Sequence, residues 1–561
     1  MRILLGANVS AEKDYQNIPS FLYEGASDKG KATLGQIDLS SWVNENTLSY
    51  HTTINKYHNL DFLLGFTQQE SKQEIFRASS SNYVSDALSY NSLQSGSVTN
   101  TSFSYGSSNS LLSILGRINY NYDDRHSLSL SLRRDGSSRF GKDRKWGTFT
   151  SVGYSWNISN ESFFKSLKEN ISNFKLRLSY GKTGNQEIGN YQSLSTLSSD
   201  IYFFNNTKVV GFSPDRIANY DLGWETTKQV DLGIELGFFK DRLNFTVDYY
   251  QKNTTDLLLN VSIPYTSGYD TSLQNYGSIR NEGFEFGFNA KPFVGKFKWD
   301  ISGNISTNRN KVTSLGDGSS SAYIYAYSTV SYYILEVGKP IGSYYGAIYD
   351  GVLQKGEETT RGKFTYNQTA TPGDKVYKDI NGDGKFTNSE DRTIIGDAQP
   401  DFTFGLNNTF SYKNLDLSFF INGSFGNDIV NVNKEYLSFF SGLMNAAGFA
   451  RERWTESNPS TTVSRAKLDP AALDSSEFVE DGSYVRLKNI TFGYKLPKGI
   501  TRNIGVSSIR LYISATNLLT ITRYTGYDPE VSSTINALTA GTDYGAYPSA
   551  KTFNFGINVK F

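Results

Sequence analysis

Apolar and polar residues alternate with a period of two along most of this chain. Leu128, Leu130 and Leu132 are separated by serines, and the final stretch 553–561 places an apolar residue at every second position. Residues 1–6 are predicted to belong to a strand already. This alternation predicts β-strands with one apolar and one polar face, and therefore an all-β protein.

The lengths of these segments and of their connections narrow the fold. Roughly sixteen segments alternate in this way, many of them about 10–14 residues long, whereas soluble strands average about 5–6 residues and membrane-barrel strands need about 9–11. Very short connections alternate along the chain with long polar ones, as periplasmic turns and extracellular loops do in outer-membrane barrels. We therefore expect a transmembrane antiparallel β-barrel. The short connections are 123–126, 240–242, 294–296 and 413–414, and the long ones lie near 71–110, 183–223, 254–277, 311–400, 427–481 and 519–549.

Two of the long stretches are predicted to contain secondary structure of their own. The stretch 311–400 is too long for a plain loop, so we expect an extracellular insert that holds a hairpin or a small folded unit. Within 432–456, a short helix is predicted by the spacing of Tyr436, Leu437, Phe439, Phe440, Leu443 and Met444. The loop tyrosines either stack on sugars or peptides or pack the loops together, and packing is the favoured interpretation for most of them. They are Tyr323, Tyr325, Tyr327, Tyr332, Tyr333, Tyr344 and Tyr345.

The segment 379–390 follows the spacing of an EF-hand calcium loop, with Gly384 at the position of the sharp turn. Oxygen ligands at this spacing suit Ca²⁺ best and Mg²⁺ less well. We expect a structural Ca²⁺ ion that stiffens an extracellular loop. The alternative is that Asn-Gly-Asp-Gly forms only a tight turn between strands. The expected ligands are the side chains of Asp379, Asn381, Asp383 and Glu390 and the carbonyl of Lys385.

Composition excludes several classes of function. The chain has 561 residues with 55 basic and 55 acidic side chains, so its formal net charge is zero and nucleic acid is not an expected partner. No Cys and only three His are present, which leaves no thiolate chemistry and little basis for histidine catalysis, so we do not expect an enzyme. A mean hydropathy of −0.44 and the lack of any apolar run near ~20 residues argue against membrane-spanning helices.

Several separate segments carry motifs that occur together in one family. The segment 509–519 is followed by Tyr-Thr-Gly-Tyr-Asp-Pro-Glu at 524–530, and 484–494 reads Tyr-Val-Arg-Leu-Lys-Asn-Ile-Thr-Phe-Gly-Tyr. In combination these segments resemble the SusC/RagA-type TonB-dependent outer-membrane transporters, and the resemblance covers essentially the whole chain. Further similarity lies at 181–186, 224–227, 394–397, 400–402, 453–459 and at the terminal Phe561.

The resemblance implies a nutrient-uptake transporter of the cell outer membrane, surrounded by outer-membrane lipids. Family members form a 22-stranded barrel closed by a plug. They import oligosaccharides or peptides that a SusD-like surface lipoprotein captures, and the TonB complex opens them by acting on an N-terminal segment. Residues 1–561 would then supply about sixteen of the 22 strands, without the plug and without the TonB-contacting segment.

Other functions remain open at this point. A passive outer-membrane porin, or a non-functional truncated barrel, is consistent with a chain that has no plug. A soluble secreted β-protein shares the alternation, but it does not need long strands with strictly short and long connections.

Overall fold

The computed structural model describes residues 1–561 apart from 101, 206, 317, 325–331, 367, 369–370, 439–444, 468–472, 504 and 534–535. Antiparallel strands dominate the chain, which confirms the expected all-β fold. The chain divides into two compact units, and each is described by itself. Unit 1 comprises Met1–Ser155, Ser179–Lys228 and Thr254–Tyr276, and unit 2 comprises Trp156–Leu178, Gln229–Asn253 and Gly277–Phe561.

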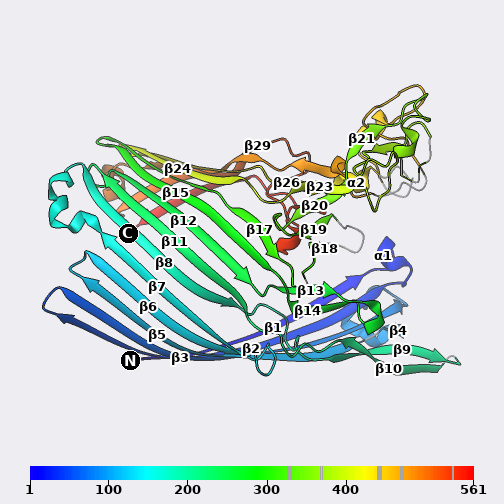
Figure 1. Ribbon diagram of the computed structural model, residues 1–561, viewed down its shortest axis with the longest axis horizontal. Coiled ribbons are helices and arrows are strands. Elements are labelled where there is room, and N and C mark those ends of the chain that lie inside the picture. Colours follow the sequence, from blue (N-terminus) through cyan, green and yellow to red (C-terminus); the bar gives the residue numbers. More distant parts are fainter. Residues whose placement is uncertain are drawn as a thin grey trace. The chain divides into compact units, whose positions relative to one another are not determined.

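The main sheet of unit 1 is a meander of long antiparallel strands (Figure 1). β1 (Arg2–Ile18) pairs with β2 (Lys31–Ile54), β2 with β3 (His58–Tyr83), β3 with β5 (Phe103–Tyr122) and β5 with β6 (His126–Ser137). β1 confirms that the first residues already belong to a strand. The unit also contains, wholly or in large part, α1 (Tyr23–Ala26), β4 (Gly96–Thr99), β7 (Trp146–Asn157), β9 (Thr196–Phe204), β10 (Thr207–Arg216), β13 (Leu258–Ser262) and β14 (Thr271–Asn275).

The strands of unit 1 run farther than the apolar alternation predicts. β2 has 24 residues and β3 has 26, and Arg77 of β3 still lies opposite Phe103 of β5. Much of the stretch 71–110 is therefore paired strand rather than loop. Polar residues continue the ladder because each backbone N–H and C=O still gains a partner there, so a polar stretch does not mark the end of a strand.

The predicted short connections are confirmed. In unit 1, Asp123 and Asp124 turn the chain between β5 and β6 with φ angles of 51° and 53°. Aspartate accepts this left-handed conformation more readily than most residues, and such turns match the twist of the flanking strands. In unit 2, Lys413 and Asn414 join the strand Phe402–Tyr412 to Leu415–Phe425, and Gly295 and Lys296 join Ser278–Val294 to Phe297–Ser306.

The main sheet of unit 2 is also an antiparallel meander. In order, it contains β15 (Ser278–Val294), β16 (Phe297–Ser306), β24 (Phe402–Tyr412), β25 (Leu415–Phe425), β28 (Tyr484–Lys495), β29 (Ser508–Thr522) and β31 (Thr552–Lys560). β17 (Arg309–Ser314) continues the pairing along β15 beyond the end of β16. β8 (Ile171–Asn185), β11 (Glu225–Phe238) and β12 (Leu243–Thr255) contribute residues to both units.

Smaller sheets fill the long connections of unit 2. β18 (Ser321–Ile324), β19 (Tyr333–Glu336), β20 (Ser343–Ala347) and β23 (Arg392–Asp397) form a four-stranded sheet, and β21 (Tyr349–Val352) pairs with β22 (Lys375–Tyr377). β26 (Asp428–Asn431) pairs antiparallel with β27 (Val479–Asp481) and parallel with β30 (Thr542–Asp543). The short helices α2 (Val432–Leu437) and α3 (Lys498–Asn503) complete the unit.

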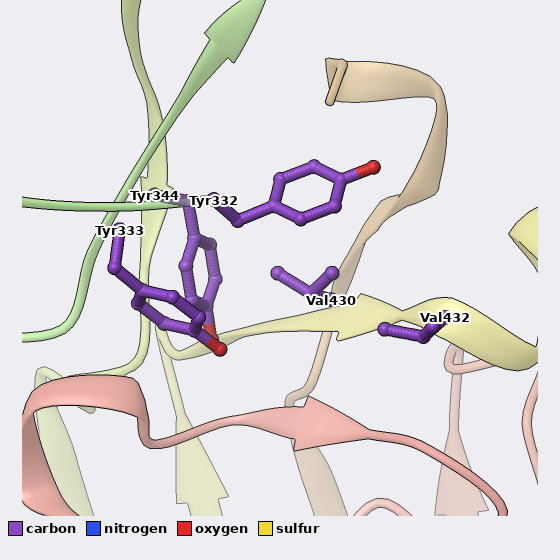
Figure 2. Packing of buried hydrophobic residues seen from close by; sticks show 5 residues of the cluster. All are labelled: Tyr332, Tyr333, Tyr344, Val430 and Val432. Atoms are coloured by element: carbon purple, nitrogen blue, oxygen red, sulfur yellow. The ribbon is translucent and has the colours of Figure 1, made fainter. Parts of the chain in front are cut away.

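These connections share a core of tyrosines and valines. Tyr332, Tyr333 and Tyr344 are fully buried and pack with Val430 and Val432 (Figure 2). The hydroxyl of Tyr344 donates a hydrogen bond to a backbone carbonyl in β26 over 2.9 Å, so its burial leaves the donor satisfied. The stretches 311–400 and 427–481 are therefore packed together, and the packing interpretation is confirmed for these three tyrosines.

The other predictions for these stretches have mixed outcomes. The rings of Tyr323 and Tyr345 contact each other with centroids 5.7 Å apart, whereas Tyr325 and Tyr327 lie outside the described residues. The predicted helix is present as α2, and the side chain of Asn431 caps it by accepting a hydrogen bond from the backbone of Lys434. The remaining residues of that prediction, Phe439, Phe440, Leu443 and Met444, are not among the described ones.

Candidate functional site

Exposed apolar side chains of unit 1 line up across neighbouring strands. Phe62 of β3 lies opposite Ile118 of β5, which in turn lies opposite Leu130 of β6. The alternate positions are polar, since Arg117 lies opposite Ser131. The strands therefore have one apolar and one polar face. The apolar face contains Phe62, Leu64, Phe66, Ile114, Ile118, Leu130 and Leu132, all of them exposed.

Unit 2 has an apolar face of the same kind. Phe492 of β28 lies opposite Ile513 of β29, which lies opposite Phe555 of β31. Contiguous apolar faces of this extent are unfavourable in water, and they mark surfaces that lipid or protein covers. Within the described ranges, no helix combines the length and the apolar character needed to cross a membrane. The face includes Phe402, Leu415, Phe492, Tyr494, Leu511, Ile513, Phe555 and Ile557.

A buried cation organises one group of connections in unit 2. The side chain of Arg486, only 3% exposed, places Nη2 at 2.5 Å from Asp528 Oδ1 and Nη1 at 2.5 Å from Glu530 Oε2. Lys488 Nζ contacts Glu530 over 2.6 Å. Burial alone would raise the pKa of Asp528, but its bonds with Arg486 lower that pKa to about 2. This network fixes the segment that follows β29 against the start of β28.

A groove of about 630 Å³ opens beside α2 and the segment 525–527. Aromatic rings form much of its lining. Those of Tyr436 and Tyr544 lie 5.7 Å apart, while Phe449 and the 76% exposed Tyr527 line the same groove. Its size and its aromatic lining are those of a ligand site, so we take this groove as the candidate functional site.

The polar groups of the groove are largely engaged with one another. Lys434 Nζ lies 2.9 Å from Glu480 Oε1, and the Glu480 carboxylate also accepts the backbone N–H of Thr525 over 2.8 Å. Burial raises the pKa of Glu480, but these hydrogen bonds hold it below its usual value. Asn433 Nδ2 is buried and has no hydrogen-bond partner among the described residues. The groove therefore offers mainly apolar contact, with its cation already paired.

The buried side of α2 carries a carboxyl, that of Glu435, whose pKa lies near neutrality. Glu435 accepts a hydrogen bond from the hydroxyl of Tyr332 over 3.3 Å. Burial, together with the nearby Asp474, raises the pKa of Glu435 to about 7. Two features of this site have no signature in the local sequence: the burial of Glu435 and the meeting of Arg486 with the segment 528–530. The motifs at 484–494 and 524–530 mark the two segments that meet, but neither indicates that they meet.

The predicted calcium loop lies between β22 and β23. Its oxygens cap the loop's own backbone, because Asp379 accepts the N–H groups of Gly382 and Gly384 over 2.6 and 2.7 Å. Asp383 in turn accepts the N–H of Lys385 over 3.1 Å. The flanking elements are strands rather than the helices of a sensor. The local geometry is that of a tight turn with its hydrogen bonds satisfied.

The donor chemistry of this loop suits Ca²⁺, and the side chains of two predicted ligands lie close together. Glu390 Oε2 lies 3.5 Å from Asn381 Nδ2, which is a donor and not a metal ligand. Across the described part of the chain, no three His, Cys, Asp or Glu residues are grouped so as to hold a metal ion. The fully buried Asp391, which the sequence did not single out, accepts the N–H groups of Ile380 and Thr387 and closes the loop. Calcium binding stays a prediction.

Long strands in which apolar and polar residues alternate, with one exposed apolar face, are typical of one class of protein. This class consists of membrane proteins whose lipid-facing surface is made of β-strands. Comparison with known proteins then identifies the family. A family model described as "TonB dependent receptor-like, beta-barrel" matches residues 5–518, and the chain belongs to this family. It is therefore an outer-membrane β-barrel protein of a family of transporters rather than enzymes, as expected.

Comparisons with individual relatives support the same family assignment. "TonB-dependent receptor P3" of Formosa agariphila is 37% identical over 555 residues, covering 97% of this chain and 54% of the relative. "TonB-dependent receptor SusC" of Bacteroides thetaiotaomicron is 32% identical over 474 residues, covering 82% of this chain and 44% of SusC. A solved structure, the RagAB peptide transporter, matches with a TM-score of 0.84 and 28% identity over 100% of this chain and 59% of its own. The chain spans about half the length of these curated relatives, and the expected SusC/RagA type is confirmed.

Proposed function

We propose that this chain supplies the barrel of an outer-membrane transporter that imports oligosaccharides or peptides. In this proposal a SusD-like surface lipoprotein captures the cargo, and the TonB complex provides the energy for import. The observation that carries the proposal is the match to the RagAB peptide transporter, which extends over the whole chain with a TM-score of 0.84. The 32% sequence identity to SusC, over an alignment that covers 82% of the chain, adds further support.

The groove beside α2 is the proposed point of contact with cargo. Tyr527 and Tyr544 present exposed ring faces, which suit the apolar face of a sugar ring or an apolar peptide side chain. Because Lys434 is already paired with Glu480, the groove favours an uncharged part of the cargo.

Uptake by cells that carry the full-length gene tests this proposal. Labelled oligosaccharides and labelled peptides are supplied separately, and their accumulation is measured for the wild type, for Tyr527→Ala and for Tyr544→Ala. Tyr547→Ala is the matched control, because Tyr547 is 94% exposed and does not line the groove. We expect both groove variants to lower the uptake of one cargo class several-fold while the control stays at the wild-type level. Uptake of neither class by the wild type would overturn the proposal.

A further inference from the structure

A second pocket in unit 2, of about 400 Å³, lies at the long-connection end of β15 and β17. Its lining is charged rather than aromatic. One wall carries Arg280 and Glu282 of β15 with Arg309 and Lys311 of β17, and the other wall carries Asp397 and Asp401. None of these residues belongs to the groove beside α2.

The register of the strands shows which way the first wall faces. Lys311 lies opposite Arg280, and Arg309 lies opposite Glu282, so the four side chains share one face of the β15–β17 pair. Positions 280 and 282 have the same parity as 284 along β15. Phe284 is 57% exposed and its ring contacts that of Tyr249 with centroids 5.1 Å apart. The charged group therefore continues the apolar face, just beyond its last aromatic residues.

The cations and the carboxylates of this pocket lie on separate walls for the most part. Arg309 and Lys311 are exposed, and neither forms an ion pair within the part of the chain that the structure describes. Arg280 Nε donates to Asn253 Oδ1 over 2.9 Å, a neutral partner. Glu282 is the single acid on the β15–β17 wall, which therefore carries an excess of positive charge, while Asp397 and Asp401 on the other wall bring the pocket to three cations and three carboxylates. On the opposite wall, the Asp397 carboxylate accepts the backbone N–H of Gln399.

We propose that this pocket binds the phosphate of a membrane-lipid headgroup. A strand face that is apolar and then abruptly cationic matches a lipid, whose chains cover the apolar part while its phosphate lies at the cations. Arg309 and Lys311 contact the phosphate from β17, and Arg280 holds its position through Asn253. The carboxylates of Asp397 and Asp401 face the hydroxyl or ammonium donors of the same headgroup. This inference does not depend on which cargo the protein imports.

Binding to the purified full chain in an uncharged detergent tests this site. The probes are a short-chain phosphatidylethanolamine, whose headgroup carries both a phosphate and an ammonium group, the matching diacylglycerol that lacks the headgroup, and inorganic phosphate alone. We expect saturable binding of the phosphatidylethanolamine only. At about 1 kcal/mol for each surface cation, the double variant Arg309→Gln/Lys311→Gln should weaken it about 30-fold.

The control variant is Lys296→Gln/Lys298→Gln, which removes two exposed cations at the opposite end of the same strand pairing. It should bind like the wild type. Equal weakening by both double variants would overturn the proposal, because the attraction would then depend on net charge alone. Inorganic phosphate binding as tightly as the lipid would overturn the lipid source. Thermal unfolding of each variant verifies that all of them are folded.

Discussion

Arg486 and Asp528 are joined by a buried ion pair of 2.5 Å, although they lie 42 residues apart in the chain. Each belongs to one of the two segments whose motifs carry the family resemblance. The pair joins the two segments, because the arginine of one has its partners, Asp528 and Glu530, in the other. The motif is therefore a structural clamp on the segment that follows β29.

Replacing Arg486 should lower the free energy of unfolding substantially. Arg486→Met leaves Asp528 and Glu530 without their main partner, and breaking a buried ion pair in this way typically costs about 3–5 kcal/mol. Arg361→Met, at a partly exposed pair with Asp350, should cost about 1 kcal/mol or less. Denaturant unfolding compares the two variants, and limited proteolysis reports whether residues 523–549 become accessible. Similar losses for both would contradict the clamp.

The stability of unit 2 should fall as the pH rises toward neutrality. The folded-state pKa of Glu435, about 7, lies above its ordinary value of 4.5, so the folded state holds the proton more tightly. The resulting stabilisation is complete below pH ~4.5 and is lost as the pH passes about 7, with an upper limit of about 3 kcal/mol.

Glu435→Gln isolates this effect, because the amide stays neutral and its oxygen still accepts the hydrogen bond of Tyr332. The thermal unfolding temperatures of the variant and the wild type should nearly coincide at pH 4.5, and the variant should be the more stable protein at pH 8. The same difference at both pH values would show that Glu435 does not titrate in this range.

One glycine of β15 is required by the pairing of its neighbours. A Cβ atom at Gly283 would lie 2.0 Å from the backbone oxygen of Thr307, a residue whose own N–H donates a hydrogen bond to the carbonyl of Phe284 in β15. At Gly287 the nearest atom would be 3.9 Å away. Gly283→Ala should therefore lower the unfolding temperature and the yield of folded protein, while Gly287→Ala should behave like the wild type. Equal tolerance of both would contradict the register of β15.

Calcium binding at residues 379–390 is testable by titration. If the loop holds Ca²⁺, the purified chain should gain thermal stability as Ca²⁺ is added, and Asp383→Ala should abolish that gain. Asp143→Ala, at an exposed aspartate of unit 1, is the control and should keep it. A wild-type protein that shows no shift up to millimolar Ca²⁺ would leave the segment as a self-capped turn, held by Asp379 and Asp391.

The sequence predicted the strands and turns well because their physics is local. Alternation in 128–132 and 553–561 and the aspartates at 123–124 determine strand faces and turns within a few residues. Contacts between distant segments were not predictable in this way. The burial of Tyr344 depends on β26, and the pKa of Glu435 depends on Asp474. The lengths of β2 and β3 were also underestimated, since polar residues pair as readily as apolar ones.

The central claim is energised import through this barrel, and cargo accumulation with and without an energy supply tests it most directly. Cells carrying the full-length gene are given the labelled cargo, and uptake is measured before and after the proton-motive force is dissipated and in a strain without TonB. The account predicts that gene-dependent uptake stops in both cases. Uptake that continues unchanged would contradict it and would identify the protein as a passive pore.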